Sequence, residues 1–239
     1  MDAQRRMRIP VWRPVCLLAL AAVFISGARA QQDSETVKQF WPEVDVYVPL
    51  NERFRLFILA TTTKAEETRE NIEGQVGAHI DYLIHRKASL RAGYRYGFSL
   101  GGSDPFKEHR IVFEQTLRQP LPLDVLLSDR NREDLRWVNG EFSARYRNRV
   151  TLEREFKILN RQITPYGSAE VFYDSRFKTW NRNRFAVGAQ IALKRGAPLI
   201  SLIHPEKQFV LDVYLMRQND SRSEPHHVNA LGMAFNIYF

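Results

Sequence analysis

The sequence predicts an all-β fold, an antiparallel up-and-down transmembrane β-barrel of about twelve strands, with ten as the alternative count. Three features support this prediction: repeated segments in which apolar and polar residues alternate, an aromatic carboxy-terminal strand, and an amino-terminal export signal. Side chains of a strand point to opposite faces in turn, so a strand in a membrane barrel presents one face to lipid and the other to the interior.

The last nine residues, Leu231 to Phe239, fit the closing strand of such a barrel. They carry an apolar side chain at every second position and end on an aromatic residue. The residues that would face lipid are Leu231, Met233, Phe235, Ile237 and Phe239. We expect a monomer in outer-membrane lipid, recognised by the barrel-assembly machinery through the strand that ends at Phe239.

Residues 1–30 are predicted to be a cleavable signal peptide. Four arginines between positions 5 and 13 precede and flank an apolar run, Val15–Ile25, and Ala28-Arg29-Ala30 forms an A-x-A cleavage site. The apolar run is too short for a spanning helix, which needs about 20 residues. We therefore expect cleavage after Ala30, a single barrel domain over residues 31–239, and location in the outer membrane of a Gram-negative bacterium.

Charge and cysteine content exclude several other classes of function. The chain has 35 basic and 27 acidic residues, but loss of the leader would reduce its formal charge from +8 to +4. The high isoelectric point is therefore weak evidence for nucleic-acid binding, and we expect no nucleic-acid partner. The single cysteine, Cys16, lies in the leader, so a disulfide framework and a thiolate metal site are both excluded. The sequence indicates no cofactor.

Alternating segments of the length that a tilted strand needs recur through the chain. The candidate strands are Trp41–Leu50, Arg53–Thr61, Ile72–Tyr82, Leu90–Phe98, Arg110–Arg118, Leu123–Leu127, Ala144–Glu153, Pro165–Asp174, Arg184–Leu193, Phe209–Leu215 and Leu231–Phe239. These are eleven segments, whereas bacterial single-chain barrels have an even number of strands. We therefore expect a twelfth strand.

Loop lengths predict an orientation, because outer-membrane barrels have short periplasmic turns and longer extracellular loops. The last strand would end in the periplasm, with periplasmic turns at His85–Lys87 and Gln119–Pro122. The outer loops would be Thr63–Arg69, Gly101–Lys107, the stretch after Asn131, Thr179–Asn183 and Gln218–His227. The link Lys194–Gln208 is long for a periplasmic turn.

Arginine dominates the face that would point inward. The candidate residues that line the lumen are Arg91, Arg95, Arg110, Glu114, Arg130, Arg132, Arg145, Arg147, Arg149, Glu153, Glu170, Arg182 and Arg184. One interpretation is a structural barrel, in which guanidinium groups pair with carboxylates and fill the interior. The other is a narrow passive pore that prefers anions, because the predicted inward arginines outnumber the acids. Charge reversal at three neighbouring arginines, Arg145, Arg147 and Arg149, would shift ion preference if they line water.

An enzyme of the outer leaflet, such as a lipid acyl hydrolase, is a further alternative. Ser168 and Glu170 share one strand face and His79 faces inward from another strand, so a Ser-His-Glu set can be assembled on paper. With six histidines such a trio is expected by chance, and we assign no catalytic residue. His226-His227 are adjacent residues with no evident third ligand, so we expect no metal site. Binding of a surface ligand by the outer loops stays open.

Several local patterns resemble a known family. They are His109-Arg110 with Glu114-Gln115, the Arg130–Glu133 segment, Phe142–Arg147 with Arg149, the Tyr166–Tyr173 strand, the His227–Phe239 strand, and the Trp41-Pro42 hairpin. In these patterns the chain resembles the uncharacterised Gram-negative outer-membrane family filed as domain of unknown function 2490. The resemblance implies an outer-membrane barrel and no established activity, so no functional residue follows from it.

A secreted lipocalin-like barrel and a periplasmic sandwich would also show alternation, with the apolar face turned inward. The aromatic ending, the alternation of short turns with longer loops, and the nearly continuous Arg/Glu face favour the inside-out arrangement.

Overall fold

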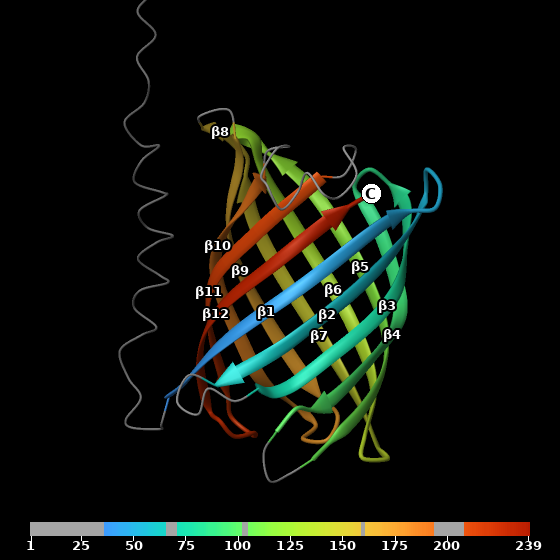
Figure 1. Cartoon of the computed structure of the whole chain (residues 1–239), viewed down its shortest axis with the longest axis vertical. Helices are drawn as coiled ribbons and strands as arrows, with labels where there is room; N and C mark the ends of the chain where they lie inside the picture. The colour runs from blue at the N-terminus through green and yellow to red at the C-terminus, as the bar shows by residue number, and fades with distance from the viewer. Residues whose placement is uncertain (1–35, 66–70, 102–104, 159–160, 194–207) are drawn as a thin grey trace, which may run out of the picture. The chain divides into compact units, whose positions relative to one another are not determined.

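The computed structural model describes residues 36–65, 71–101, 105–158, 161–193 and 208–239. The described residues form a β-barrel (Figure 1). Its strands are β1 (Thr36–Pro49), β2 (Phe54–Ala65), β3 (Asn71–His85), β4 (Ala88–Ser99), β5 (Lys107–Leu121), β6 (Val125–Val138), β7 (Glu141–Arg154), β8 (Phe156–Ile158), β9 (Arg161–Asp174), β10 (Thr179–Leu193), β11 (Gln208–Asp220) and β12 (His227–Tyr238). The 3-10 turn η1 (Pro122–Asp124) joins β5 to β6. No helix within these ranges is long and apolar enough to cross a membrane.

Eleven of the described strands close the barrel, and the short strand β8 pairs beside β9 outside this ring. The prediction of a barrel of about twelve strands is confirmed, with β8 as the twelfth. One pairing departs from the up-and-down pattern, because β1 and β12 run parallel, from Thr36 opposite His227 to Tyr47 opposite Tyr238. An even number of strands follows only when the first and last strands pair antiparallel, so the parallel seam allows an odd ring.

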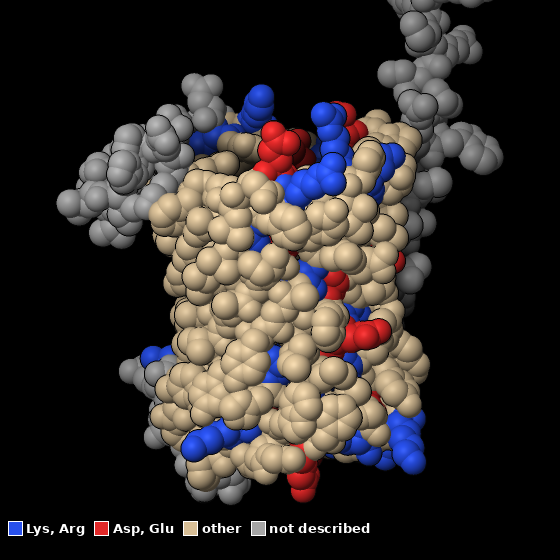
Figure 2. Space-filling model, turned by 90° about the vertical axis from the view of Figure 1, so that its right-hand side faces the viewer, with Lys and Arg blue, Asp and Glu red and all other residues tan. Residues whose placement is uncertain are grey.

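The barrel is apolar outside and charged inside, as the sequence predicts for a membrane barrel. Val187 on β10 and Leu215 on β11 are 64% and 62% exposed, whereas Asp134 on β6 and Asp174 on β9 are 0% exposed. Figure 2 shows one wall, where uncharged residues cover most of the surface and charged side chains gather mainly at the two ends. A lipocalin-like barrel or a sandwich would have the opposite polarity.

Two of the predicted outer loops are wrong. Asn131 lies in the middle of β6, which turns into β7 at residues 139–140, and Thr179–Asn183 lies within β10. Polar side chains on both faces of these strands, including the buried Arg132 and Asn181, gave the two segments the composition of a loop. The predicted leader, residues 1–30, and most of the long link, residues 194–207, lie outside the described residues.

The interior has an apolar part and a charged part. Over β10 to β1, buried Met216, Val228 and Ala230 pack with Trp41 and Tyr214. Small residues are needed there because large side chains lie across neighbouring strands: a Cβ added at Gly232 would clash with the ring of Tyr214. The charged part lies over β4 to β9 and contains most of the inward arginines.

The parallel seam can be tested with paired cysteines in residues 31–239, which contain no native cysteine. We expect Val44→Cys with Phe235→Cys, and Phe40→Cys with Leu231→Cys, to form disulfides under mild oxidation, because both pairs are cross-strand neighbours.

A Phe40→Cys with Phe239→Cys pair is the control, because an antiparallel seam that aligns position 44 with 235 would align position 40 with 239. Mobility on non-reducing gels reports each crosslink. A crosslink in the control pair, together with none between positions 40 and 231, would contradict the parallel seam.

Candidate functional site

The structure places the thirteen candidate residues of the arginine face on six strands. They are Arg91 and Arg95 on β4, Arg110 and Glu114 on β5, Arg130 and Arg132 on β6, Arg145, Arg147, Arg149 and Glu153 on β7, Glu170 on β9, and Arg182 and Arg184 on β10. All of them lie on the side opposite the exposed apolar residues. Most belong to one network of ion pairs, which we call the arginine network.

Glu170 is the centre of the arginine network. Its side chain is 2% exposed and accepts hydrogen bonds from Nη2 of Arg130 at 2.9 Å, Nε of Arg147 at 3.0 Å and Nη2 of Arg149 at 2.9 Å. These arginines come from β6 and β7, and β6 is not a neighbour of β9 in the sheet. The Glu170 carboxylate therefore connects β9 to its neighbour β7 and also to β6, which is not hydrogen-bonded to β9 in the sheet.

Asp134 extends the network on β6. Nε of Arg132 donates to Oδ1 at 2.7 Å, while Oδ2 lies 3.9 Å from Nη1 of Arg110 and 3.8 Å from Nη1 of Arg147. Arg147 thus pairs with both Glu170 and Asp134. Because Asp134 is fully buried, its charge is compensated by side chains alone.

The network continues toward the end of the barrel that holds the β6–β7 turn. Glu108 accepts hydrogen bonds from Arg110 and Arg136, and Arg136 lies 3.5 Å from Asp174. Asp174 also accepts from Arg145 at 2.7 Å. The result is one continuous chain of ion pairs from Glu170 to Asp174.

The turn after β9 adds a further cation to this end. Arg176 donates to both oxygens of Asp174, at 3.0 and 2.9 Å. These hydrogen bonds raise the pKa of the Arg176 guanidinium above its usual value.

Sequence reasoning missed four members of the network: Glu108, Asp134, Arg136 and Asp174. The period-two pattern could have found all four, because Glu108 and Asp134 each lie two residues from a candidate on the same strand, Arg136 lies two from Asp134, and Asp174 lies four from Glu170. The first three were missed because β5 was predicted to begin at Arg110 and the next strand to end at Leu127, whereas β5 begins at Lys107 and β6 ends at Val138.

A second group of ion pairs lies on β2 to β4. Asp81 pairs with Arg55 at 2.6 Å and with Arg91 at 2.5 Å. The guanidinium of Arg91 lies 3.9 Å from the ring centroid of Phe57, a cation–π distance. The aromatic ring thereby fixes the position of this cation.

Contacts between strands that do not pair show that side chains meet across the interior. The guanidinium of Arg184 on β10 lies 4.9 Å from the ring centroid of Trp41 on β1, although β11 and β12 separate these strands. Tyr166 on β9 donates to Asp212 on β11 at 2.9 Å, over β10. Side chains from strands two or three apart in the ring therefore meet inside the wall.

The residues considered for catalysis are not assembled into a site. His79 on β3 accepts a hydrogen bond from Arg95 at 3.1 Å, and Glu170 is held by its three arginines. No hydrogen bond within the described ranges joins Ser168 to His79. His226 pairs with Glu224 at 2.9 Å. Among the residues that the structure describes, no three His, Cys, Asp or Glu side chains are grouped to hold a metal.

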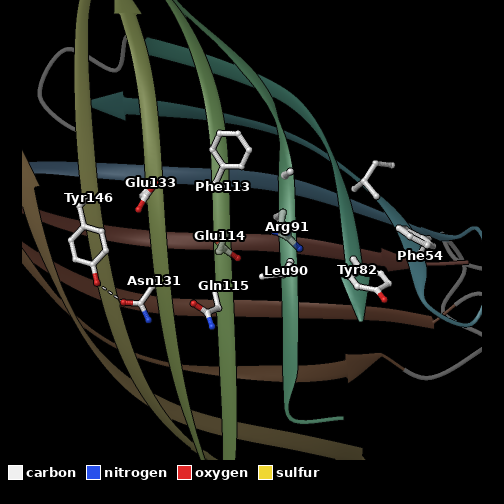
Figure 3. Close-up of a pocket in the computed structure, with 12 residues that line it drawn as sticks. Phe54, Tyr82, Leu90, Arg91, Phe113, Glu114, Gln115, Asn131, Glu133 and Tyr146 are labelled. Carbon is white, nitrogen blue, oxygen red and sulfur yellow. Dashed lines mark hydrogen bonds between the residues drawn. The ribbon is translucent and has the colours of Figure 1, made fainter. Parts of the chain in front are cut away.

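The outer wall carries a pocket of about 510 Å³ (Figure 3). Its lining residues are Phe54, Ile80, Tyr82, Leu90, Arg91, Ala92, Phe113, Glu114, Gln115, Asn131, Glu133 and Tyr146. At its polar end, Tyr146 donates to Asn131, and Asn148 beside it donates to Asp129 at 2.6 Å. The lining includes no serine, cysteine or histidine, so it offers none of the usual nucleophiles or bases of an acyl hydrolase.

Comparison with known proteins identifies the family. A family model described as a protein of unknown function (DUF2490) matches residues 38–229. The chain belongs to this family. The match confirms the resemblance inferred from the sequence. Among solved structures, the β domain of the Bordetella autotransporter BrkA is similar to the DUF2490 chain, with a TM-score of 0.40 and 14% identity over 78% of this chain and 83% of that one. No curated protein matches.

The arginine network predicts an unequal effect of two carboxylate substitutions in the DUF2490 chain. Glu170→Gln should lower the free energy of unfolding by about 3–5 kcal/mol, because it removes the counter-charge that the buried Arg147 and the part-buried Arg130 and Arg149 share. Glu153→Gln, on β7 and outside the network, should change it by about 0.5 kcal/mol or less.

Denaturant unfolding of the two refolded variants in detergent measures the difference. Equal destabilisation by the two substitutions would show that Glu170 has no special structural role.

Proposed function

We propose that this DUF2490 protein is an outer-membrane β-barrel that acts as a structural, non-conducting barrel because the arginine network closes its interior. The single observation that carries the proposal is the continuous chain of buried ion pairs from Glu170 through Arg147 and Asp134 to Asp174. The family match supplies no activity, so the function rests on this geometry.

The exterior supports the membrane location. Large apolar side chains are exposed along the wall, and a soluble protein would hide so large an apolar surface. Aromatic pairs lie at both ends of the barrel, Trp137 with Phe142 at one end and Phe54 with Tyr82 at the other. Aromatic girdles of this kind mark the two membrane interfaces of outer-membrane barrels.

The proposal includes export and assembly. The leader would direct the chain across the inner membrane of a Gram-negative bacterium and be cleaved after Ala30. The assembly machinery would recognise β12 through the aromatic end at Phe239, and the barrel would be a monomer with its carboxy-terminus in the periplasm. The position of β12 supports this role, because this strand forms the seam with β1 over twelve paired residues.

An open, anion-preferring pore is less well supported than a closed barrel. A selectivity surface needs charged groups that face water. Arg132 is 3% exposed and Asp134 is 0% exposed, so their charges are directed at each other. Glu108 and Asp174, which the sequence reasoning did not count, also face inward and reduce the surplus of positive charge.

Planar-bilayer recording of refolded residues 31–239 in a salt gradient tests the proposal. We expect no stepwise conductance from the native sequence. Arg147→Ala should produce brief openings, because Arg147 joins Glu170 to Asp134, whereas Arg161→Ala, at an exposed rim position, should stay silent.

Stepwise conductance of the native barrel with an anion-shifted reversal potential would contradict the proposal. It would make the arginine face a selectivity surface, and charge reversal at Arg145, Arg147 and Arg149 would then shift the ion preference.

A further inference from the structure

Arg217 differs from the inward arginines because it lies on the outer wall. It is on β11, three residues before the strand ends, on the same face as exposed Leu215. Its cross-strand neighbours are Phe185 on β10 and Asn229 on β12. At about 3.3 Å per residue, Arg217 lies within about 10 Å of the strand end. This end of the barrel is the lower one in Figure 1, where β12 and β1 begin.

Two asparagine side chains hold the Arg217 guanidinium. Nε donates to Oδ1 of Asn219 at 3.0 Å, and Nη1 donates to Oδ1 of Asn229 at 3.0 Å. Arginine has only donors, so both amide oxygens must face it and both amide nitrogens must point elsewhere. The arginine therefore fixes the direction of its neighbours' hydrogen bonds.

The hydrogen bonds continue from Asn219 to two further side chains on the outer wall. Oδ1 of Asn219 also accepts from Nδ1 of His227 at 2.9 Å, and Nδ2 of Asn219 donates to Oδ1 of Asn183 at 2.9 Å. Nη2 of Arg217 and Nδ2 of Asn229 find no acceptor among the described residues. The group of Arg217, Asn219, Asn229, Asn183 and His227, which we call the rim cluster, thus leaves these two donors available, while donation by Nδ1 makes Nε2 of a neutral His227 an acceptor.

The rim cluster is also positively charged. No carboxylate within the described ranges lies at ion-pair distance from Arg217, whereas the inward arginines of the network pair with Asp or Glu. A surface with free donors and positive charge is complementary to an anion with several acceptor oxygens.

We propose that the rim cluster binds a phosphate group of a glycolipid in the outer leaflet. The inference rests on the proposed function, since that orientation places this end of the barrel at the extracellular side. An outward-facing cluster within about 10 Å of the strand end lies near the lipid headgroups. Guanidinium groups bind phosphate through paired hydrogen bonds, and the amide of Asn229 can add another.

The test uses refolded residues 31–239 in detergent, which carry no native lipid, and native mass spectrometry. The probes are bisphosphorylated lipid A, the same lipid A without its phosphates, and inorganic phosphate. We expect the native chain to bind bisphosphorylated lipid A about tenfold more tightly than the dephosphorylated form. Arg217→Gln should abolish the preference, and Arg217→Lys should retain part of it.

Lys107→Gln is the matched control, because Lys107 is an exposed cation at the same end of the barrel on β5. It should leave binding unchanged. Equal binding of both lipid A forms by the native chain would overturn the inference, and this comparison does not depend on any variant folding. Displacement of lipid A by an equimolar amount of inorganic phosphate would overturn the assignment to a lipid.

Conductance separates this inference from the proposed function. A barrel that inserts, does not conduct and shows no preference for phosphorylated lipid A would overturn only the assignment of phosphate binding to the rim cluster. A barrel that conducts yet prefers phosphorylated lipid A would overturn the closed interior alone. A chain that does not insert into bilayers would overturn both.

Discussion

Charges inside the barrel are removed from water, and the organisation of the interior follows from the need to pair them. Glu170 meets this need for three arginines, and in doing so it connects β9 to β7 and to β6, which it does not neighbour. Arg147 pairs with both Glu170 and Asp134 and so links the two carboxylates. Hydrogen bonds along the sheet join only adjacent strands, so the arginine network provides the contacts that hold non-adjacent parts of the wall in a fixed relation.

Most of the fold could be predicted, because period-two alternation is a direct consequence of a strand between lipid and interior. Each of the eleven predicted segments overlaps one strand of the ring. The parallel seam could not be predicted, since alternation says which way a side chain points and nothing about the direction of the neighbouring strand. The loop predictions at Asn131 and Thr179–Asn183 failed because polar residues on both faces of a strand give it the composition of a turn.

The candidate site was less accessible to sequence reasoning. The inward arginines could be selected from alternation, but their partners come from strands far apart in the chain, as Arg130 and Glu170 illustrate. Asp134 was missed because its strand was predicted to end too early, and this omission exaggerated the apparent surplus of positive charge. Arg217 could not be recognised from the sequence, because its hydrogen-bond partner Asn229 lies on a different strand.

Hydrogen exchange at the arginine Nε–H groups tests the closed interior most directly. NMR of arginine-labelled protein in micelles would compare Arg132 and Arg147, whose Nε–H groups donate to Asp134 and Glu170, with Arg161 at an exposed rim position. The paired interior predicts exchange at Arg132 and Arg147 at least about a hundredfold slower than at Arg161, because exchange requires the buried ion pair to open. Equal exchange at all three positions would mean that water reaches the network, and would contradict the account.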